Sequence, residues 1–403
     1  MNRRLLYTAT LLSLGLASPV SAGGLWLNQF GDFAAGRASA GASAGVDEAS
    51  TIIHNPASSL QLDGSQMFLA AGVILTDIQF DIEESNPISG FDDGGDAGLD
   101  APVSSFAYVH DTGSDKWNAG VYVAGMSGAG LEYNDDWVGR FQTTQVEILI
   151  LSVAPTAAYQ VTDQFSIGAA VQYYYGSLDL KLAIPSIRPE VDNGKGKLDG
   201  TDTGFSFALG AVYEISESTR VGINYQSELD LEFDGNLKVP ANSVKVDSNT
   251  ELPLAQTIRA SLSHQLDDQI GFHFTVGWDG WSTLDEVFVS LPSQGASLKK
   301  NWDDTYHYAA GFQYAVNRKW DITAGLAYDT SPVGSEDRTA DLPVDRQVRL
   351  NAGARYALRE NLDLGGFVNY TDLGNSKISN DRWKGEYDTN VAVEIGVYAN
   401  WRL

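Results

Sequence analysis

The chain has 403 residues and a formal net charge of −26, with 52 acidic and 26 basic side chains. Because nucleic acid binding needs basic patches, this balance argues against nucleic acid as a partner. The chain has no cysteine and no phosphate loop, HExxH site or paired-cysteine metal site, so we expect no cofactor and no metal.

The first 22 residues have the features of an export signal. Arg3 and Arg4 precede an apolar stretch from Leu5 to Ala17, and Val20-Ser21-Ala22 is a small-residue cleavage site. We therefore predict a signal peptide over residues 1–22. Beyond it, no stretch approaches the roughly 18 consecutive apolar residues of a membrane helix. If the chain spans a membrane, it does so with strands, and only closed barrels satisfy strand backbones in lipid.

Residues 23–63 are rich in small side chains and predict short helices and turns, compact enough to lie inside a larger structure. Gly41-Ala42-Ser43-Ala44-Gly45 matches the hydrolase pattern G-x-S-x-G, but that pattern requires a preceding strand and a histidine partner. No strand precedes it, and the five histidines do not cluster in the sequence. Close packing of small residues is the favoured interpretation, and we expect no catalytic residue and no enzyme activity.

Alternation of apolar and polar residues begins at Gly64. The final segment shows it best, because Val391, Val393, Ile395, Val397 and Ala399 fall on one face. Period-two alternation marks half-buried strands, and counting such segments gives about fourteen. The sequence thus predicts an all-β transmembrane antiparallel barrel over 64–403, with 23–63 as a plug, or hatch, in its lumen.

The connections between these strands alternate between short and long. That asymmetry is typical of outer-membrane barrels, which carry long loops outside and short turns on the periplasmic rim. An even strand count places both termini on the periplasmic rim. The short connections lie near Thr112–Asp115, Thr162–Asp163, Ser216–Ser218, Asp267–Asp268, Asn317–Arg318 and Arg359–Glu360. The long ones run through Glu83–Asp100, Gly125–Thr143, Ala183–Asp199, Gly235–Leu254, Ser282–Trp302, Ser331–Pro343 and Gly374–Glu386. Interfacial rings are expected from Trp117, Trp278, Trp302, Trp320 and Trp401.

Two strands lack a polar face. Val146–Val153 and much of Met67–Leu75 are apolar on both sides, so the face turned from lipid meets an apolar interior. Packing against the plug and a passage for an apolar substrate both explain this pattern. Pro155, just after the first of these runs, lacks a ladder donor and predicts a strand end, edge or local distortion.

An acidic run, Asp92-Asp93-Gly94-Gly95-Asp96 with Asp100, lies in the first long connection. Clustered carboxylates can bind divalent cations, and calcium could bridge them to lipopolysaccharide phosphates. The run lacks the spacing of a calcium loop, so a solvated acidic loop is the favoured interpretation.

Several motifs together resemble the FadL-type outer-membrane transporters of long-chain fatty acids and other hydrophobic compounds. They are collinear from about Gly24 to the C-terminus. They comprise Leu25-Trp26-Leu27-Asn28, Ala49–Ala57 with Leu62-Asp63-Gly64, Trp137-Val138-Gly139-Arg140-Phe141, Pro155–Gly168, Trp278–Ser282, Asn301–Tyr306, Tyr328–Val333, Asp337-Arg338 and Leu342-Pro343.

The resemblance implies a fourteen-stranded barrel with an N-terminal hatch. Substrate is caught at the extracellular loops, passes to an inner pocket touched by the N-terminal tail, and leaves through a lateral opening, without an energy source. It places Leu25 and Trp26 near the pocket and makes Asn55-Pro56-Ala57 the hatch motif. Arg140 is the candidate partner of a substrate carboxylate, with a loop salt bridge to Asp135 or Asp136 as the alternative. The substrate-binding candidates are completed by Phe141, Leu149 and Leu151.

The predicted function is passive uptake of long-chain fatty acids or related hydrophobic compounds across a Gram-negative outer membrane. We expect a monomer surrounded by outer-membrane lipid and lipopolysaccharide. Some relatives carry a lysine where this chain has Asp303, and a carboxylate there would repel a fatty acid anion. Uncharged substrates such as alkanes or aromatics therefore stay open, as do a porin-like channel for small solutes and an outer-membrane lipase.

Overall fold

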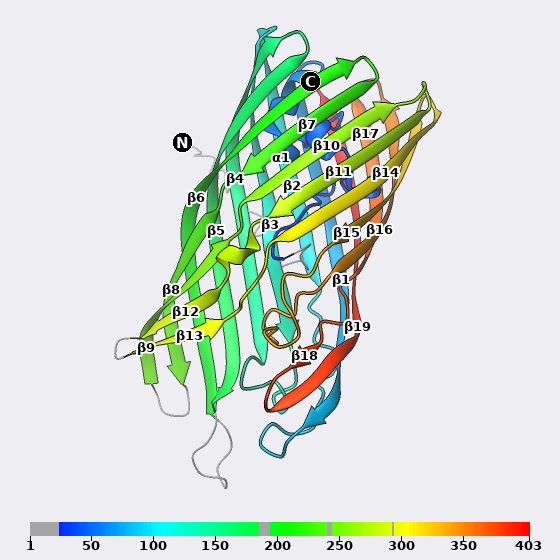
Figure 1. Ribbon diagram of the computed structural model, residues 1–403. Helices are drawn as coiled ribbons and strands as arrows, with labels where there is room; N and C mark the ends of the chain where they lie inside the picture. The colour runs from blue at the N-terminus through cyan, green and yellow to red at the C-terminus, as the bar shows by residue number, and fades with distance from the viewer. Residues whose placement is uncertain (1–23, 185–193, 240–243, 292–293) are drawn as a thin grey trace, which may run out of the picture.

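The computed structural model describes residues 24–184, 194–239, 244–291 and 294–403. The predicted signal peptide lies outside these residues. The chain forms a closed antiparallel barrel of fourteen strands (Figure 1), because β1 pairs with both β2 and β19. The predicted fold class is therefore confirmed. Because the first and last strands pair, the sheet has no terminal edge, as a strand structure in lipid requires.

Four of the wall strands are each divided into two segments, and β18 is a short addition beside β19. The undivided strands are β1 (Gln66–Ser85), β2 (Ala101–Ser114), β3 (Trp117–Glu132), β4 (Gln145–Thr162), β5 (Phe165–Ile184), β6 (Gly194–Ser216), β15 (Trp320–Asp329), β16 (Gln347–Arg359), β17 (Leu362–Asp372) and β19 (Trp383–Arg402). The divided strands are β7 (Thr219–Gln226) with β8 (Leu229–Val239), β9 (Val244–Leu254) with β10 (Thr257–Gln265), β11 (Ile270–Asp279) with β12 (Glu286–Leu291), and β13 (Gln294–Lys299) with β14 (Thr305–Asn317); β18 is Ile378–Ser379.

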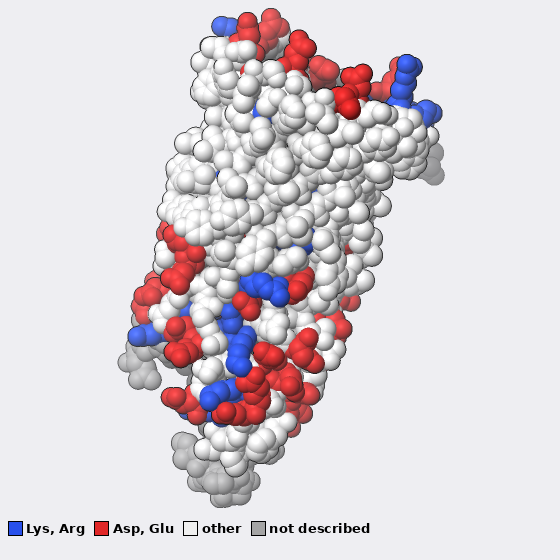
Figure 2. Space-filling view, turned by 45° about the vertical axis from the view of Figure 1, so that its right-hand side comes forward, with Lys and Arg blue, Asp and Glu red and all other residues white. Residues whose placement is uncertain are grey.

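Alternation along each strand separates a lipid face from a lumen face. In β19, Ile395 and Val397 are exposed on the outside, while Tyr398 and Asn400 are buried inside. Figure 2 shows a band with few charged side chains between two charged ends of the barrel. An apolar exterior band of this kind suits contact with hydrocarbon.

Short turns occupy one end of the barrel, the turn rim, and the long connections occupy the other, the loop rim (Figure 1). The hatch and the C-terminus lie towards the turn rim. Three predicted long loops are corrected. β8 and β9 form a paired hairpin over much of 235–254, β12 and β13 form one within 282–302, and β3 continues to Glu132 within 125–143. Strand pairing continues past the apolar band because hydrogen bonding between strands does not depend on lipid contact.

Trp302 is a further correction. It is only 4% exposed and packs edge-on against Trp281, with ring centroids 5.4 Å apart. It lies inside the barrel rather than in an outer ring. Trp117 and Trp320 begin β3 and β15 at the turn rim and are exposed, as an interfacial position requires.

The hatch consists of four short helices inside the barrel: η1 (Ala35–Arg37), η2 (Ala42–Ala44), α1 (Thr51–His54) and η3 (Pro56–Gln61). Strand glycines let its backbone approach the wall closely. A Cβ added to Gly222 would lie 1.9 Å from the Ser43 carbonyl oxygen, and one on Gly325 would lie 2.2 Å from the Arg37 carbonyl carbon. Ser43 thus lies in a tightly packed run of small residues. Among the described residues, no helix has the length and apolarity to cross a membrane.

Asn55 links the hatch to the wall. Its Nδ2 donates to the carbonyl oxygens of Ser43 at 2.7 Å and of Ala211 and Ile223 at 3.2 Å. Its Oδ1 accepts from the amide of Ala57 at 3.0 Å and caps η3. The motif residue Pro56 begins that helix, where a missing N–H has no cost.

Replacing Asn55 with alanine is expected to loosen the hatch, because four hydrogen bonds are lost and buried carbonyls are left unpaired. The expected destabilisation is about 1–3 kcal/mol. In planar bilayers, Asn55→Ala should raise single-channel ion conductance above that of the native protein. Asn317→Ala, at the exposed end of β14, where Oδ1 accepts from the amides of Lys319 and Trp320, is the matched control. Equal conductance in all three proteins would contradict this role of Asn55.

Candidate functional site

The barrel wall is interrupted between β2 and β3. Their pairing runs from the Ser114–Trp117 turn to Ser105 opposite Ala124 and then stops. Beyond that point β3 bulges between Gly125 and Ser127 but keeps its pairing with β4. Residues 101–104 of β2 pair only with β1. The described wall therefore has a gap next to the bulge.

The N-terminal segment crosses this gap from the inside. The amide of Leu27 donates to the carbonyl of Met126 at 2.9 Å, and Trp26 forms an isolated antiparallel bridge with Ser127. The Ser127 hydroxyl donates to the Leu25 carbonyl, and the Ser105 hydroxyl on β2 donates to the Phe30 carbonyl. Residues 25–31 are thus tied to both strands that border the gap, and we call them the gate segment.

A cavity of about 350 Å³ lies at the gap. Residues from both faces of the wall line it, so it runs from the lipid face to the lumen. Its outer part includes Leu69, Phe106, Val123, Leu149 and Leu151. Its inner part includes Asn28, Gln29, Phe30, Gln347, Arg349, Phe367 and Glu394.

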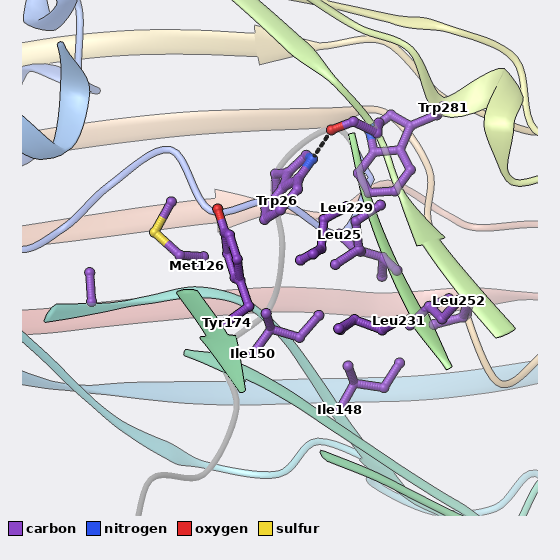
Figure 3. Packing of buried hydrophobic residues seen from close by; sticks show 14 of the residues in the cluster. Leu25, Trp26, Met126, Ile148, Ile150, Tyr174, Leu229, Leu231, Leu252 and Trp281 are labelled. Atoms are coloured by element: carbon purple, nitrogen blue, oxygen red, sulfur yellow. Dashed lines mark hydrogen bonds between the residues drawn. The ribbon is translucent and has the colours of Figure 1, made fainter. Parts of the chain in front are cut away.

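An apolar cluster fills the lumen on the other side of the gate segment (Figure 3). Leu25 and Trp26 are buried in it, and Nε1 of Trp26 donates to the Ala255 carbonyl at 2.6 Å. A Cβ on Gly24 would lie 2.1 Å from Nε1 of Trp281, so only glycine fits there. Their neighbours include Ile148, Ile150, Leu229, Leu231, Leu252 and Trp281.

β4, which is apolar on both faces, borders both the apolar lumen cluster and the wall cavity. Val146, Ile148 and Ile150 of β4 are buried towards the lumen, while Leu149 and Leu151 line the outer part of the wall cavity. The predicted role of Leu149 and Leu151 in substrate binding stays a prediction, now with a defined location. Pro155 interrupts the ladder to β5 between Val153 and Thr156 without a change of register. The gap lies at β2 and β3, not at Pro155.

Arg140 is 8% exposed and connects segments of the loop rim. Its guanidinium donates to four backbone carbonyls, those of Ile88, Ser89, Asp136 and Trp137. Its carbon atom Cζ lies 4.5 Å from the ring centroid of Phe141. Asp135 pairs with Lys195 instead, and Asp136 contributes its carbonyl, so the salt bridge with either residue is not formed. A substrate role for Arg140 and Phe141 stays a prediction.

Asp303 is exposed, and its amide donates to the Pro332 carbonyl at 2.7 Å. The buried charge nearby is Lys300, whose Nζ lies 2.7 Å from Oδ2 of Asp341. Burial alone would raise the pKa of Asp341, but the Lys300 ammonium outweighs burial and lowers it. The Asp303 carboxylate is therefore exposed rather than part of the buried apolar cluster, and its repulsion of an anionic substrate stays a prediction.

The acidic run of the first long connection folds on itself. Oδ1 of Asp92 accepts from the Gly94 amide at 2.9 Å, Oδ1 of Asp93 from the Gly95 amide at 3.0 Å, and Oδ1 of Asp100 from the Thr76 amide at 3.0 Å. Within the part of the chain that the structure describes, no group of three metal-ligating side chains converges. The carboxylates of Asp92 and Asp93 thus stabilise turns, and that of Asp100 bonds to the backbone of β1.

Sequence reasoning did not identify the polar end of the wall cavity. Arg349 lies there, bonded to Asp329 and to Gln347, and Glu394 lies two strands away. The alternating pattern already placed Arg349 on the polar face of its strand. It could not indicate which lumen side chains border a cavity, because that depends on the distant gap between β2 and β3.

Two buried acids lie in the hatch: Asp32, directly after the gate segment, and Glu48. Burial and the nearby Asp32 raise the pKa of Glu48 to about 8. Its Oε1 accepts from the Phe33 amide at 2.7 Å, and its Oε2 has no described partner. Burial alone would raise the pKa of Asp32, but His54, 2.7 Å away, and Arg37 outweigh it and lower that pKa.

Comparisons with known proteins agree with this architecture. The family described as "Outer membrane protein transport protein (OMPP1/FadL/TodX)" matches residues 13–400. A protein named "Long-chain fatty acid transport protein" from Escherichia coli O6:H1 is 25% identical over 408 residues, covering 90% of this chain and 91% of the relative.

Two solved structures share the fold. A Pseudomonas aeruginosa FadL homologue superposes with a TM-score of 0.85 at 18% identity, covering 94% of this chain and 99% of its own. The Pseudomonas putida toluene transporter TodX gives a TM-score of 0.71 at 18% identity, covering 95% and 100%. At these identities the likeness is one of fold.

Glu48 makes hatch stability pH-dependent. Below pH 4.5 the carboxyl is neutral in the packed and the released hatch; between 4.5 and about 8 only the released form ionises, so stability falls as pH rises. Glu48→Gln should remove this loss. Hydrogen exchange of hatch amides, corrected for intrinsic rates, should show the variant better protected at pH 8, whereas Glu217→Gln in an exposed turn should match the native protein. An unchanged pH dependence in Glu48→Gln would refute the assignment.

Proposed function

We propose a function from one premise: the chain belongs to the OMPP1/FadL/TodX family of outer membrane transport proteins. It is an outer-membrane transporter of hydrophobic compounds in a Gram-negative bacterium. In our proposal, the loop rim faces outward and captures the substrate, the apolar lumen cluster receives it, and the gap between β2 and β3 releases it sideways into the membrane. The substrates are long-chain fatty acids or related hydrophobic molecules.

The wall cavity is the observation that carries this proposal. Its outer lining is apolar and belongs to the lipid face, while its inner lining includes the gate segment. A molecule that leaves through this cavity passes from the apolar lumen to the apolar interior of the membrane. Each methylene kept out of water is favoured by about 0.8 kcal/mol, so for a long alkyl chain this exit is strongly preferred over an exit into the periplasm.

The gate segment supplies a means of release. Leu25 and Trp26 occupy the apolar cluster that a substrate would need, so substrate and tail compete for the same surroundings. Movement of the tail in one direction frees the lumen site, and its return displaces the substrate. No energy source is required, because the concentration gradient drives net movement.

The substrate class is supported by the relatives and by the lining. The names of the relatives include both long-chain fatty acid transport and toluene transport. The described lumen holds aromatic side chains such as Trp26, Tyr174 and Trp281 beside leucine and isoleucine, which accommodates alkyl chains and rings alike. Asp303 is exposed and does not belong to the buried apolar cluster.

Filling the gap tests the lateral route. A Cβ built on Gly125 meets no atom within 4 Å, and Gly125 lines the cavity, so Gly125→Trp should place an indole in the opening without disturbing the wall. Uptake of radiolabelled long-chain substrate into cells lacking other transporters should fall at least about tenfold. An increase of only about 1.4 kcal/mol in the free-energy barrier to passage lowers the rate tenfold.

Ala352→Trp is the matched control, because Ala352 is exposed on the lipid face of β16, away from the gap. It should transport at the native rate. Both variants should reach the outer membrane in native amounts, as measured by fractionation. Native uptake by Gly125→Trp at equal abundance would eliminate the lateral exit through this gap.

Deleting Gly24–Trp26, with export preserved, tests the role of the tail. The deletion empties part of the apolar cluster, and burial of a side chain such as Leu or Trp amounts to about 1.5–3 kcal/mol. We expect substrate to bind about tenfold more tightly and to be taken up more slowly, because the competing group is gone. Equilibrium binding in nanodiscs and cellular uptake measure the two quantities. If neither changes, the tail has no part in transport.

A further inference from the structure

We propose that the inner end of the wall cavity is a binding site for an uncharged polar head group, the hydroxyl or protonated carboxyl of a long-chain amphiphile. This proposal rests on the proposed lateral route, because it concerns the same cavity. It adds a selection step: the cavity recognises the head of the departing molecule as well as its alkyl chain.

The donor of this site is Arg349. It lines the cavity from β16 and is 4% exposed. Its Nη2 donates to Oδ2 of Asp329 and, at 3.3 Å, to Oε1 of Gln347. Its Nη1 has no hydrogen-bond partner among the described residues. A buried donor without a partner is unfavourable, and an oxygen atom of a ligand in the cavity would satisfy it.

The charge of Arg349 is already balanced. Asp329 is completely buried and accepts from Arg349 and, at 2.8 Å, from Nδ1 of His307. The pair thus leaves an unused N–H without leaving an unmatched positive charge. Such a group favours a neutral acceptor, because it offers hydrogen bonding without net attraction for an anion.

The hydrogen-bond acceptor of the proposed site is Glu394. It lines the same cavity from β19, and its Oε2 accepts from Nδ2 of Asn369 at 2.9 Å. β17 lies between β16 and β19, so the backbones that carry Arg349 and Glu394 are about 10 Å apart. A hydroxyl between the two long side chains can accept from one and donate to the other. An ionised carboxylate cannot donate and is repelled by Glu394.

The gate segment brings two more donors to this end of the cavity. Nδ2 of Asn28 and Nε2 of Gln29 are buried and have no partner in the described chain. The oxygen of each amide is engaged, Asn28 Oδ1 by Arg259 and Gln29 Oε1 by Asn369, which fixes the orientation of both amides. Three unpaired donors beside one carboxylate form a polar end, while Leu69, Phe106 and Leu151 form the apolar end.

Binding of three matched probes to the full protein in nanodiscs tests the proposal. The probes are radiolabelled 1-tetradecanol, tetradecane and tetradecanoate at pH 9, with empty nanodiscs subtracted. The native protein should bind tetradecanol about tenfold more tightly than either other probe, the gain expected for one or two added hydrogen bonds. Equal binding of tetradecanol and tetradecane, or tightest binding of tetradecanoate, would overturn the head-group site.

Two conservative variants localise the effect. Arg349→Lys keeps a cation for Asp329 but lacks the second terminal nitrogen of the guanidinium, so the tetradecanol advantage should shrink to within about twofold while tetradecane binding is unchanged. Glu394→Gln keeps an oxygen for Asn369 but removes the negative charge, so tetradecanoate should gain about tenfold. A full tetradecanol advantage in Arg349→Lys, or no gain in Glu394→Gln, would overturn the assignment.

The two proposals fail separately. If uptake by Gly125→Trp falls but tetradecanol has no advantage in the native protein, the lateral route stands and the head-group site is wrong. If uptake by Gly125→Trp stays native at equal abundance, the cavity is not the route and both proposals are overturned. Heat-modifiable electrophoretic mobility confirms that each variant forms the barrel.

Discussion

Backbone hydrogen bonding in hydrocarbon is the constraint on which this structure depends. A strand in lipid must pair on both edges, because no water is present to replace a missing partner. The gap between β2 and β3 violates this rule locally, and the gate segment compensates for it. The Leu27 amide bonds to the Met126 carbonyl, and Ser105 and Ser127 donate to the segment from both sides. The wall can therefore open only where a second piece of chain lines it.

The lumen is divided into two layers with different chemistry. Towards the turn rim, the hatch is held by directional polar contacts such as those of Asn55, and by glycines that admit its backbone. Around Leu25 and Trp26, the apolar cluster makes non-directional contacts. The gate segment lies at the boundary. The segment is anchored where it joins the hatch, and its contacts in the apolar cluster can be exchanged at a small cost in free energy. This combination suits a movable element.

The sequence was sufficient to predict the features that follow from local composition and periodicity. Alternation predicts the strands, small residues predict the hatch, and turn lengths predict the two rims. It failed where a residue's surroundings come from distant elements. Trp302 looks interfacial by position but packs on Trp281. The sequence also could not indicate which loop carbonyls the Arg140 guanidinium would contact. The sequence could not locate the β2–β3 gap, because Gly125 begins a predicted long loop, whereas β3 continues through this region to Glu132.

A polar inner end at the wall cavity is consistent with the energetics of lateral release. An ionised head that enters hydrocarbon loses its hydration, a cost of many kcal/mol, whereas a neutral hydroxyl or carboxyl loses far less. Arg349 neutralised by Asp329, beside Glu394, offers hydrogen bonds without stabilising the ionised form. A site that held the anion tightly would trap it at the point of exit. A site matched to the neutral form instead prepares the molecule in the protonation state that the bilayer accepts, so recognition and release favour the same species.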